Sequence, residues 1–431
     1  MEITKITLKN IRCFENLEID LSRHDGAKKW LVILGDNGVG KTTVLRSIAL
    51  GLCEEAGASA LLAELAGEWI RTGAEKGTIR IELKPYPGYN GVASIETTLT
   101  RSDYGEYKLQ QLNTPKTPSD FSWEKLFVCA YGAGRGVFGT ADLSEYAVTD
   151  SVYSLFNYKS ELQNPELNLR RIASEAVDTS LILRKLEKVL MVKEGAIALN
   201  KSGITIDGSW GKSMPTGTLS DGYVGTLTWL LDMYGWKLLF DEKMTDTELR
   251  GIIIVDELEQ HLHPKWQKQI IKLLSDQFPD VQFITSSHSP LCVIGTTDLN
   301  DDECAITVLH QGEGKVLSKS ASPPRGKRAD QVLTSYLFEL YSTSDNQIKN
   351  NIEQYNNLYK LERNDSQEVE FQRLYKYLNE TLGSAETELE KKVGQVLNNT
   401  LNALFADKIK DESVKKSPEN FELIRQLNEL L

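Results

Sequence analysis

The sequence predicts an α/β fold with a mixed central sheet covered by helices, followed by a helical C-terminal region. Three observations favour this fold class. "WLVIL", "GIIIV" and "VQFIT" are continuous apolar runs, which are typical of central strands buried on both faces. A glycine-rich loop joins the first of these runs to a segment with a helical pattern. Further helical patterns occupy residues 151–200 and the chain beyond residue 345.

The composition indicates a globular protein with more than one structural unit. At roughly 150 residues per domain, the 431 residues correspond to about two or three units. The net charge of −12 excludes a generally basic coat for nucleic acid but is compatible with a local basic groove. Five scattered cysteines without a CxxC pair indicate a reduced protein without a zinc site of the usual spacing. Neither a signal-like start nor a membrane-length apolar run is visible, so we expect a cytoplasmic protein that does not cross membranes.

The first part of the chain predicts strands around one helix. Residues 3–34 contain the alternating patterns "ITKITL" and "LEIDL" and then the apolar run "WLVIL". A helix is expected from the glycine-rich loop to about residue 55. Residues 78–100 alternate again and predict a β pair. "LFVCAYGAGRG" predicts a buried strand that ends in a second glycine-rich loop.

The later elements define the expected domains. "AIALNKSGITIDG" predicts a hairpin around Asn200 to Gly203. We expect a head domain at residues 1–320, with a helical lobe at about 140–240, and a C-terminal helical region at 321–431. The segment 363–367 is a candidate break in the last helices. These helices either support a partner or a dimer or pack on the head, and the sequence leaves both alternatives open.

The first glycine-rich loop matches the pattern GxxxxGK[ST], a phosphate cradle between a strand and a helix. Glycines allow positive φ and let backbone N–H groups point at phosphate oxygens near the positive end of the following helix. We expect Lys41 to reach the β- and γ-phosphates of a nucleotide, Thr42 to bind magnesium and Thr43 to continue the helix start. The candidate nucleotide-binding residues are Gly35, Asp36, Asn37, Gly38, Val39, Gly40, Lys41, Thr42 and Thr43.

Two adjacent carboxylates follow the apolar strand "GIIIV". In a phosphate-transfer site one carboxylate holds the magnesium shell and another positions the attacking water. Asp256 fits the first role and Glu257 the second. The alternative is a pair of surface acids at a strand end. The fully apolar strand favours a central position, with its carboxyl end at the edge of the sheet where ligands bind.

His288 follows the next apolar strand, in "FITSSHSP". A histidine at such a position can contact a γ-phosphate or respond to its loss. A lone loop histidine is more often structural, but the neighbouring strand with its two acids favours a catalytic role for His288.

The segment "LSDGY" precedes a strong helix pattern. The Ser220 hydroxyl, the Gly222 backbone and the helix N-terminus together predict an anion site. The alternative is a plain N-cap formed by Ser220 or Asp221, which the local pattern alone favours.

In order and spacing, "GDNGVGKT", "LSDGY", "IIIVDE" and "TSSHSP" resemble the Walker A, signature, Walker B and H-loop motifs of ABC-type ATPases. The opening "ITLKNIRCFENLEIDL" resembles the branch that includes RecF, the SMC proteins and the prokaryotic defence ATPases. The resemblance covers residues 1 to about 310. "DELEQHLHPKWQ" is similar to the compact Septu- and retron-type members, in which His261 and Pro264 would lie in or near the D-loop.

The resemblance implies a homodimer or higher homo-oligomer that holds ATP and Mg²⁺ between its protomers. Ser220 and Gly222 would then act in trans on the nucleotide held by the other protomer. It also implies that Arg12 lies near the base or ribose. Arg135 would reach phosphate or a salt bridge, and Gln163 is a candidate for the Q-loop glutamine.

Departures from the family narrow the expectation. The stretch from Lys41 to Leu219 is too short for the long coiled coils of SMC proteins. No TOPRIM or other nuclease set is visible, and we interpret Asp298, Asp301, Asp302 and Glu303 as a solvated loop.

We therefore expect an ATP phosphohydrolase that dimerises on ATP and gates a separate effector, such as a nuclease, in antiviral defence. The alternative is a RecF-like DNA-binding repair ATPase, and a further one is a nucleotide-binding scaffold with little turnover. The DNA-binding alternative needs a basic strip, for which a solvated helix face is the competing interpretation. The candidate basic residues are Arg101, Lys108, Arg170, Arg171, Arg184, Lys185 and Lys188.

Overall fold

The structure is a computed structural model, and its chain divides into two compact units, Met1–Tyr341 and Ser342–Leu431. None of the helices in the described part of the chain combines the length and the apolar character that a membrane crossing requires. The residues described are 1–24, 26–65, 67–84, 93–101, 107–114, 126–135, 138–139, 145–175, 177–241, 244, 246–312, 315–340, 346–359 and 364–382.

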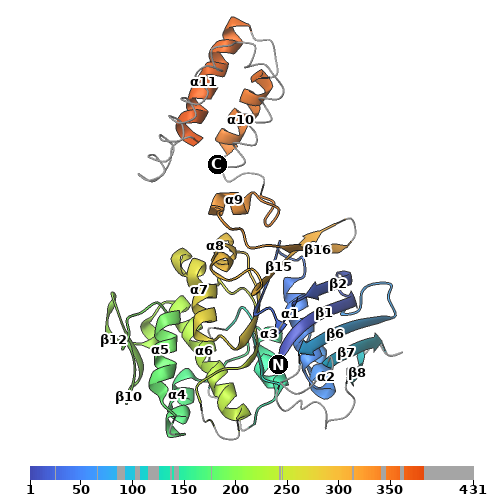
Figure 1. Ribbon diagram of the computed structural model, residues 1–431, viewed down its shortest axis with the longest axis vertical. Helices are drawn as coiled ribbons and strands as arrows, with labels where there is room; N and C mark the ends of the chain where they lie inside the picture. Colours follow the sequence, from blue (N-terminus) through green and yellow to red (C-terminus); the bar gives the residue numbers. More distant parts are fainter. Residues whose placement is uncertain are drawn as a thin grey trace. The chain divides into compact units, whose positions relative to one another are not determined.

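A six-stranded sheet forms the centre of the first unit (Figure 1), in the order β16-β15-β5-β14-β13-β9. All neighbouring strands are parallel except the edge pair of β15 and β16. The carboxyl ends of the parallel strands therefore meet at one edge of the sheet. The strands are β5 (Trp30–Gly35), β9 (Val128–Tyr131), β13 (Gly251–Val255), β14 (Val281–Ser286), β15 (Cys304–Gln311) and β16 (Val316–Ala321).

A five-stranded antiparallel sheet lies beside it, in the order β2-β1-β6-β7-β8. The helix α1 (Lys41–Leu52) packs between the two sheets and buries Leu45 and Ile48. A Cβ added at Gly51 would lie 2.6 Å from Ile81 Cδ1, so a glycine allows this close approach. The other elements are β1 (Glu2–Ile11), β2 (Phe14–Asp20), β3 (Ser22–Arg23), β4 (Gly26–Ala27), β6 (Lys76–Lys84), β7 (Ala93–Arg101), β8 (Tyr107–Thr114) and α2 (Glu55–Glu64).

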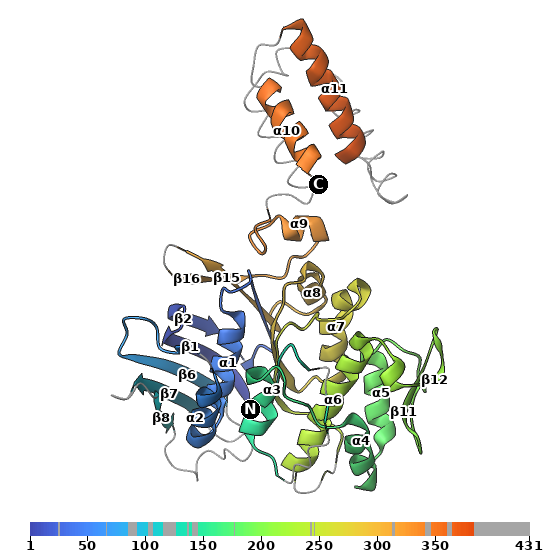
Figure 2. The same cartoon turned by 180° about the vertical axis from the view of Figure 1, so that it is seen from behind.

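In the region of the predicted helical lobe, the described residues form short helices and a small sheet before the long helix α6 (Asp221–Phe240) (Figures 1 and 2). The predicted hairpin is confirmed, because Asn200 pairs with Gly203 at the turn. The lobe comprises α3 (Val148–Phe156), α4 (Pro165–Ser174), α5 (Thr179–Val189), β10 (Ile197–Asn200), β11 (Gly203–Gly208), β12 (Gly211–Pro215) and η2 (Thr216–Thr218). The remaining elements are α7 (Pro264–Gln277), α8 (Pro290–Gly295), η3 (Thr296–Asp298) and α9 (Ala329–Leu333).

The division between the units falls after Tyr341, later than the sequence prediction after residue 320. The reason is local packing, because β16 extends to Ala321 in the central sheet and α9 buries Val332 in the same core. In the second unit α10 (Asn346–Tyr359) and α11 (Asp365–Leu382) form a helix pair in which Tyr355 stacks on Phe371. The predicted tail beyond residue 382 lies outside the described residues.

Candidate active site

The predicted phosphate cradle connects β5 to α1 and has the backbone that an anion site requires. Gly35, Gly38 and Gly40 have φ of 143°, 81° and 107°, in the region that favours glycine. A Cβ at Gly40 would lie 2.7 Å from Cys13 Sγ and 2.9 Å from Phe14 Cζ, so a side chain does not fit there. No side chain caps α1, and its first-turn N–H groups are therefore directed into the loop for an anion to bind.

Lys41 is buried inside the loop, with 6% of its surface exposed. Its ammonium group donates to the carbonyl oxygens of Gly35 and Asp36 over 2.8 and 2.9 Å. Burial lowers the pKa of Lys41, while the nearby carboxylates of Asp256 and Glu257 oppose this shift. The arrangement concentrates one positive charge at the point where the predicted phosphates would bind.

Thr42 and Asp256 come together as predicted for a magnesium site. Thr42 Oγ1 donates to Asp256 Oδ2 over 2.7 Å, and Ser286 Oγ donates to the second oxygen of the same carboxylate. A hydroxyl and a carboxylate beside a phosphate cradle are the oxygen ligands that Mg²⁺ uses in nucleotide sites. The donor set therefore fits this ion with phosphate oxygens and water completing the shell. The sequence did not indicate the role of Ser286, which depends on the pairing of β13 with β14.

Glu257 lies beside this carboxylate with an unusual backbone. Its φ is 50°, in the left-handed region that non-glycine residues seldom occupy. Its N–H donates to Ser286 Oγ over 2.8 Å. The Glu257 side chain is half-buried, and across the described ranges no hydrogen bond ends on its carboxylate. It is thus available to orient a water molecule.

His288 follows β14, and its backbone N–H donates to the Glu259 carboxylate. The other oxygen of Glu259 is buried without a partner in the described part of the chain. Sequence reasoning missed Glu259, although its position two residues beyond Glu257 at the same strand end was a usable signal. His288 is half-buried, and the strand before it, β14, pairs in parallel with β13, the strand before Asp256.

Ser220 occupies the N-cap position of α6, but its hydroxyl forms no capping hydrogen bond and the residue is exposed. The Ser220 hydroxyl therefore does not act as a plain N-cap. Gly222 is buried, and a Cβ there would lie 2.5 Å from the carbonyl oxygen of His261. The helix start thus packs directly on the segment after Glu257.

Arg135 and Gln163 are both buried and have partners in distant segments. The Arg135 guanidinium forms no ion pair among the described residues and donates to the main-chain oxygens of Asp256 and Glu257 over 2.7 Å each. Burial lowers its pKa to about 10, which leaves it cationic at neutral pH. Gln163 packs against α6, where its N–H donates to Asp232 Oδ1 over 2.8 Å. Its amide nitrogen is buried without a partner among the described residues.

Arg12 has a φ of 47°, and its guanidinium lies 4.6 Å from the centre of the Trp69 ring. This cation–π contact holds the Arg12 side chain in the turn after β1. The next residue, Cys13, contacts the cradle, because its thiol donates to the Val39 oxygen over 3.6 Å. The predicted location of Arg12 near a base or ribose stays a prediction.

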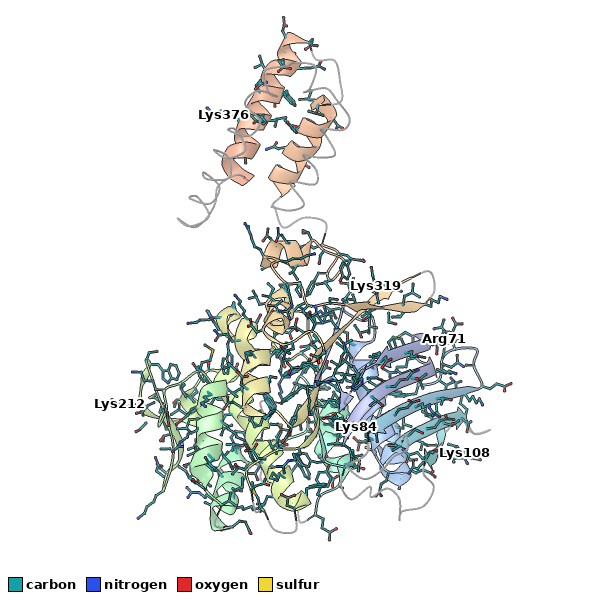
Figure 3. The ribbon with its side chains drawn as sticks, in the orientation of Figure 1. Arg71, Lys84, Lys108, Lys212, Lys319 and Lys376 are labelled. Atoms are coloured by element: carbon teal, nitrogen blue, oxygen red, sulfur yellow. The ribbon has the colours of Figure 1, made fainter. Side chains whose placement is uncertain are left out.

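The predicted basic strip is divided between two parts of the first unit. Arg101 and Lys108 lie on β7 and β8, whereas the other candidates lie on α4 and α5 on the opposite side of this unit (Figures 1 and 3). Several of these residues form ion pairs, as expected for a solvated helix face. The pairs are Arg101–Glu68, Arg170–Glu166, Arg184–Glu194 and Lys185–Glu248.

The acids at residues 298–303 also form local contacts. Asp301 pairs with Arg325 at 2.9 Å, and Asp302 pairs with Arg23 at 3.7 Å. No group of three or more His, Cys, Asp and Glu side chains that could hold a metal occurs among the residues described. The contacts fit the predicted solvated loop.

Two family models match the chain. A model described as "AAA domain" matches residues 5–188. A second AAA-domain model, whose description refers to the AbiEii toxin of type IV toxin–antitoxin systems, matches residues 225–293. Together they include the phosphate cradle, most of α6, the Asp256–Glu257 pair and His288.

Several known proteins are similar to this chain. The Septu protein PtuA of Bacillus mycoides (strain KBAB4) is 26% identical over 347 residues, which is 79% of this chain and 45% of that protein. The Retron Vc95 probable ATPase of Vibrio cholerae serotype O1 biovar El Tor is 40% identical over 83 residues, 19% of this chain and 15% of that protein. The chain thus matches less than half the length of these relatives. A crystal structure of the SmcHead bound to the C-winged helix domain of ScpA covers 75% of this chain and 99% of that chain, with 16% identity and a TM-score of 0.48.

The phosphate cradle and the acidic strand end both lie in segments that match AAA-domain models. In sequence the chain is similar to the Septu protein PtuA and to probable ATPases of retrons. The predicted resemblance and the predicted α/β head with a mixed central sheet are both confirmed.

Proposed function

We propose that this chain binds ATP with Mg²⁺, hydrolyses it, and uses the cycle as a molecular switch. The observation that carries the proposal is the contact between Thr42 and Asp256 at the mouth of the cradle. The Glu257 carboxylate next to it has no hydrogen-bond partner in the part of the chain that the structure describes. A cation, two oxygen ligands and a free carboxylate at one sheet edge form the set that phosphoryl transfer to water requires.

Each side chain has a separate role in this proposal. Lys41 and the α1 N–H groups bind the phosphates, while Thr42 and Asp256 would hold the magnesium ion, which neutralises charge on the phosphate oxygens. Glu257 orients the attacking water and accepts its proton as the water oxygen bonds to the γ-phosphorus. The bond from that phosphorus to the bridging oxygen of the β-phosphate breaks, and ADP is the leaving group. His288 contacts the γ-phosphate from the neighbouring strand end.

The second part of the proposal concerns a pocket shared by two copies of the chain. The Ser220 hydroxyl is exposed and uncommitted at the N-terminus of a 20-residue helix, so it can bind a phosphate outside its own protomer. ATP bound to one copy would thus be closed by Ser220 and Gly222 of a second copy. Binding favours the closed dimer and hydrolysis opens it.

The third part concerns the effector. Relationship to the Septu and retron ATPases supports a role in antiviral defence, in which the dimer gates or recruits a separate effector protein such as a nuclease. The C-terminal helix pair α10–α11 is the proposed support for that partner or for the dimer.

A Glu257→Gln variant tests the proposal, because it removes the base while leaving the phosphate and magnesium contacts. We expect the wild type to release phosphate from Mg-ATP, and the variant to retain ATP and to accumulate as a dimer in light-scattering measurements. Equal phosphate release by both proteins would remove Glu257 from the mechanism, and the absence of release by the wild type would contradict the hydrolysis.

A further inference from the structure

We propose that Arg135 is a positioning residue that holds the loop carrying Glu257 in its hydrolytic conformation. This inference rests on the proposed function, since it assigns how the water-orienting carboxylate is held. It goes beyond the sequence motifs, because Arg135 belongs to a loop after β9 that lies far from Glu257 in sequence.

The guanidinium directs its donors at the main chain of the acidic strand end. Arg135 Nη1 donates to the oxygen of Asp256 and Nη2 to the oxygen of Glu257, each over 2.7 Å. Longer contacts of 3.4 Å reach the oxygen of Leu258 and Oε1 of Gln260. The residue therefore binds the backbone on both sides of Glu257 and leaves the carboxylates of Asp256 and Glu257 unbound by it.

The N–H groups of the same two peptide bonds donate hydrogen bonds to the neighbouring strand β14. The N–H of Glu257 donates to Ser286 Oγ over 2.8 Å, and the N–H of Leu258 donates to the Ser286 oxygen over 3.1 Å. The loop is thus held between β14 and Arg135. Such support is needed because the φ of Glu257 is 50°, a sparsely populated value that persists only where the surroundings impose it.

The loop that carries Arg135 is held by close packing against another part of the main chain. A Cβ at Gly132 would lie 2.4 Å from the Ser154 oxygen, and one at Gly134 would lie 2.1 Å from the Tyr158 oxygen. The loop therefore packs backbone to backbone against the end of α3. The exposed fraction of Arg135 is only 6%, so the position of its planar fork is set by packing.

An arginine is specifically suited to this position. Its planar fork offers several N–H groups in fixed directions, whereas a lysine ammonium is a single point of charge on a flexible stem. Positive charge is also needed, because Glu259, Asp256 and Glu257 all lie near enough to interact with the guanidinium. A neutral side chain would leave both the carbonyl oxygens and these carboxylates uncompensated.

The test uses Arg135→Lys and Arg135→Ala, with Arg325→Ala as the matched control. Arg325 also donates to two main-chain oxygens, those of Thr297 and Leu299, but lies away from the cradle. We expect both Arg135 variants to lower kcat by about 10- to 100-fold with ATP affinity and KM nearly unchanged, since the cost is misplacement of Glu257. The control should keep the wild-type kcat.

Chemical rescue adds a readout that a general structural role would not produce. Arg135 lines a cavity of about 280 Å³ together with Gly134, Gln260 and His261. Guanidinium added at millimolar concentration to Arg135→Ala should enter the vacated space and restore part of kcat, whereas it should not affect Arg325→Ala. Unchanged kcat in a folded Arg135→Ala, or an equal loss of ATP affinity, would overturn the inference.

Hydrogen exchange separates this inference from the proposed function. In Arg135→Ala and Arg135→Lys, amides at residues 257–262 should exchange faster than in the wild type, while those of the five-stranded sheet stay unchanged. If the wild type releases no phosphate, the proposed hydrolysis fails and the exchange result alone decides the positioning role. Unchanged protection of residues 257–262 would then reject it.

Discussion

Thr42 Oγ1 donates a hydrogen bond to Asp256 Oδ2 over 2.7 Å, although 214 positions of sequence separate the two residues. The contact joins the first turn of α1, which follows β5, to the residue that follows β13. In the central sheet these two parallel strands are separated only by β14, so their carboxyl ends lie at the same edge. It places a hydroxyl and a carboxylate beside the phosphate cradle, and most of the functional account depends on this arrangement.

The Thr42 hydroxyl should be needed for magnesium-dependent nucleotide binding. Thr42→Val removes the oxygen while keeping the shape, so calorimetric affinity for Mg-ATP should fall by at least about tenfold, because the ion loses one of its protein oxygen ligands. Thr42→Ser keeps the oxygen and should bind almost as the wild type does. Affinity without magnesium should change little, and an equal loss with and without the ion would contradict the assignment.

Ser220 should contribute to function but not to the stability of α6. Its hydroxyl makes no capping bond, so Ser220→Ala should change the free energy of unfolding by no more than about 0.5 kcal/mol. Asn164→Ala is the comparison, because Asn164 caps α4 through the N–H groups of Glu166 and Leu167 and should lose about 1 kcal/mol. Urea unfolding measures both. A destabilised Ser220→Ala would restore the plain N-cap interpretation.

A side chain at Gly222 should lower the stability of the protein, because α6 packs closely against His261 there. The added methyl group of Gly222→Ala would lie 2.5 Å from a main-chain oxygen, so we expect a destabilisation of about 1–3 kcal/mol from overpacking. Gly217, in the preceding turn η2, has open space around its Cα, and Gly217→Ala should be nearly neutral. Thermal unfolding of the two variants compares them directly. Equal melting temperatures would show that α6 shifts freely from its neighbour.

Asp232 should make the stability of the protein depend on pH. Burial raises the pKa of Asp232 to about 7, while hydrogen bonds from the Gln163 N–H and the Tyr131 hydroxyl limit the rise. Because the folded state then binds the proton more tightly than the unfolded state, this group's contribution falls as pH rises from about 4 to about 7, by roughly 1 kcal/mol per pH unit.

The Asp232→Asn variant tests this dependence, since an amide is neutral at every pH. Its stability relative to the wild type should increase steadily between pH 4 and pH 7 and then stay constant. Urea unfolding at several pH values gives the difference. A difference independent of pH would mean that Asp232 titrates at its ordinary pKa.

The local parts of the site were predictable from sequence, and the contacts between distant segments were not. The cradle residues, the apolar strand before Asp256 and the strand before His288 are recognisable because glycine positions and apolar runs act over a few residues. The close approach of Gly222 to His261 and the hydrogen bond from Ser286 to Asp256 arise from sheet order and helix packing.

Arg135 and Gln163 illustrate the same limit. Both were recognised as polar residues near glycine-rich or helical segments, and both have partners that short-range patterns do not specify. Arg135 binds main-chain oxygens, which carry no sequence signal, and the backbone N–H of Gln163 donates to Asp232 on α6. The division into compact units likewise depends on packing, because α9, which has only a short apolar pattern, buries Val332 in the core of the first unit.

Mixing two inactive variants tests the shared pocket most directly. Lys41→Ala lacks the phosphate cation but keeps Ser220, and Ser220→Arg keeps the cradle but blocks the contact in trans. Neither alone should release phosphate. An equal mixture should recover about a quarter of the wild-type rate, because half of the dimers are mixed and each mixed dimer has one complete pocket. A mixture as inactive as its components, under conditions in which the two variants associate, would contradict the sharing of ATP between two copies.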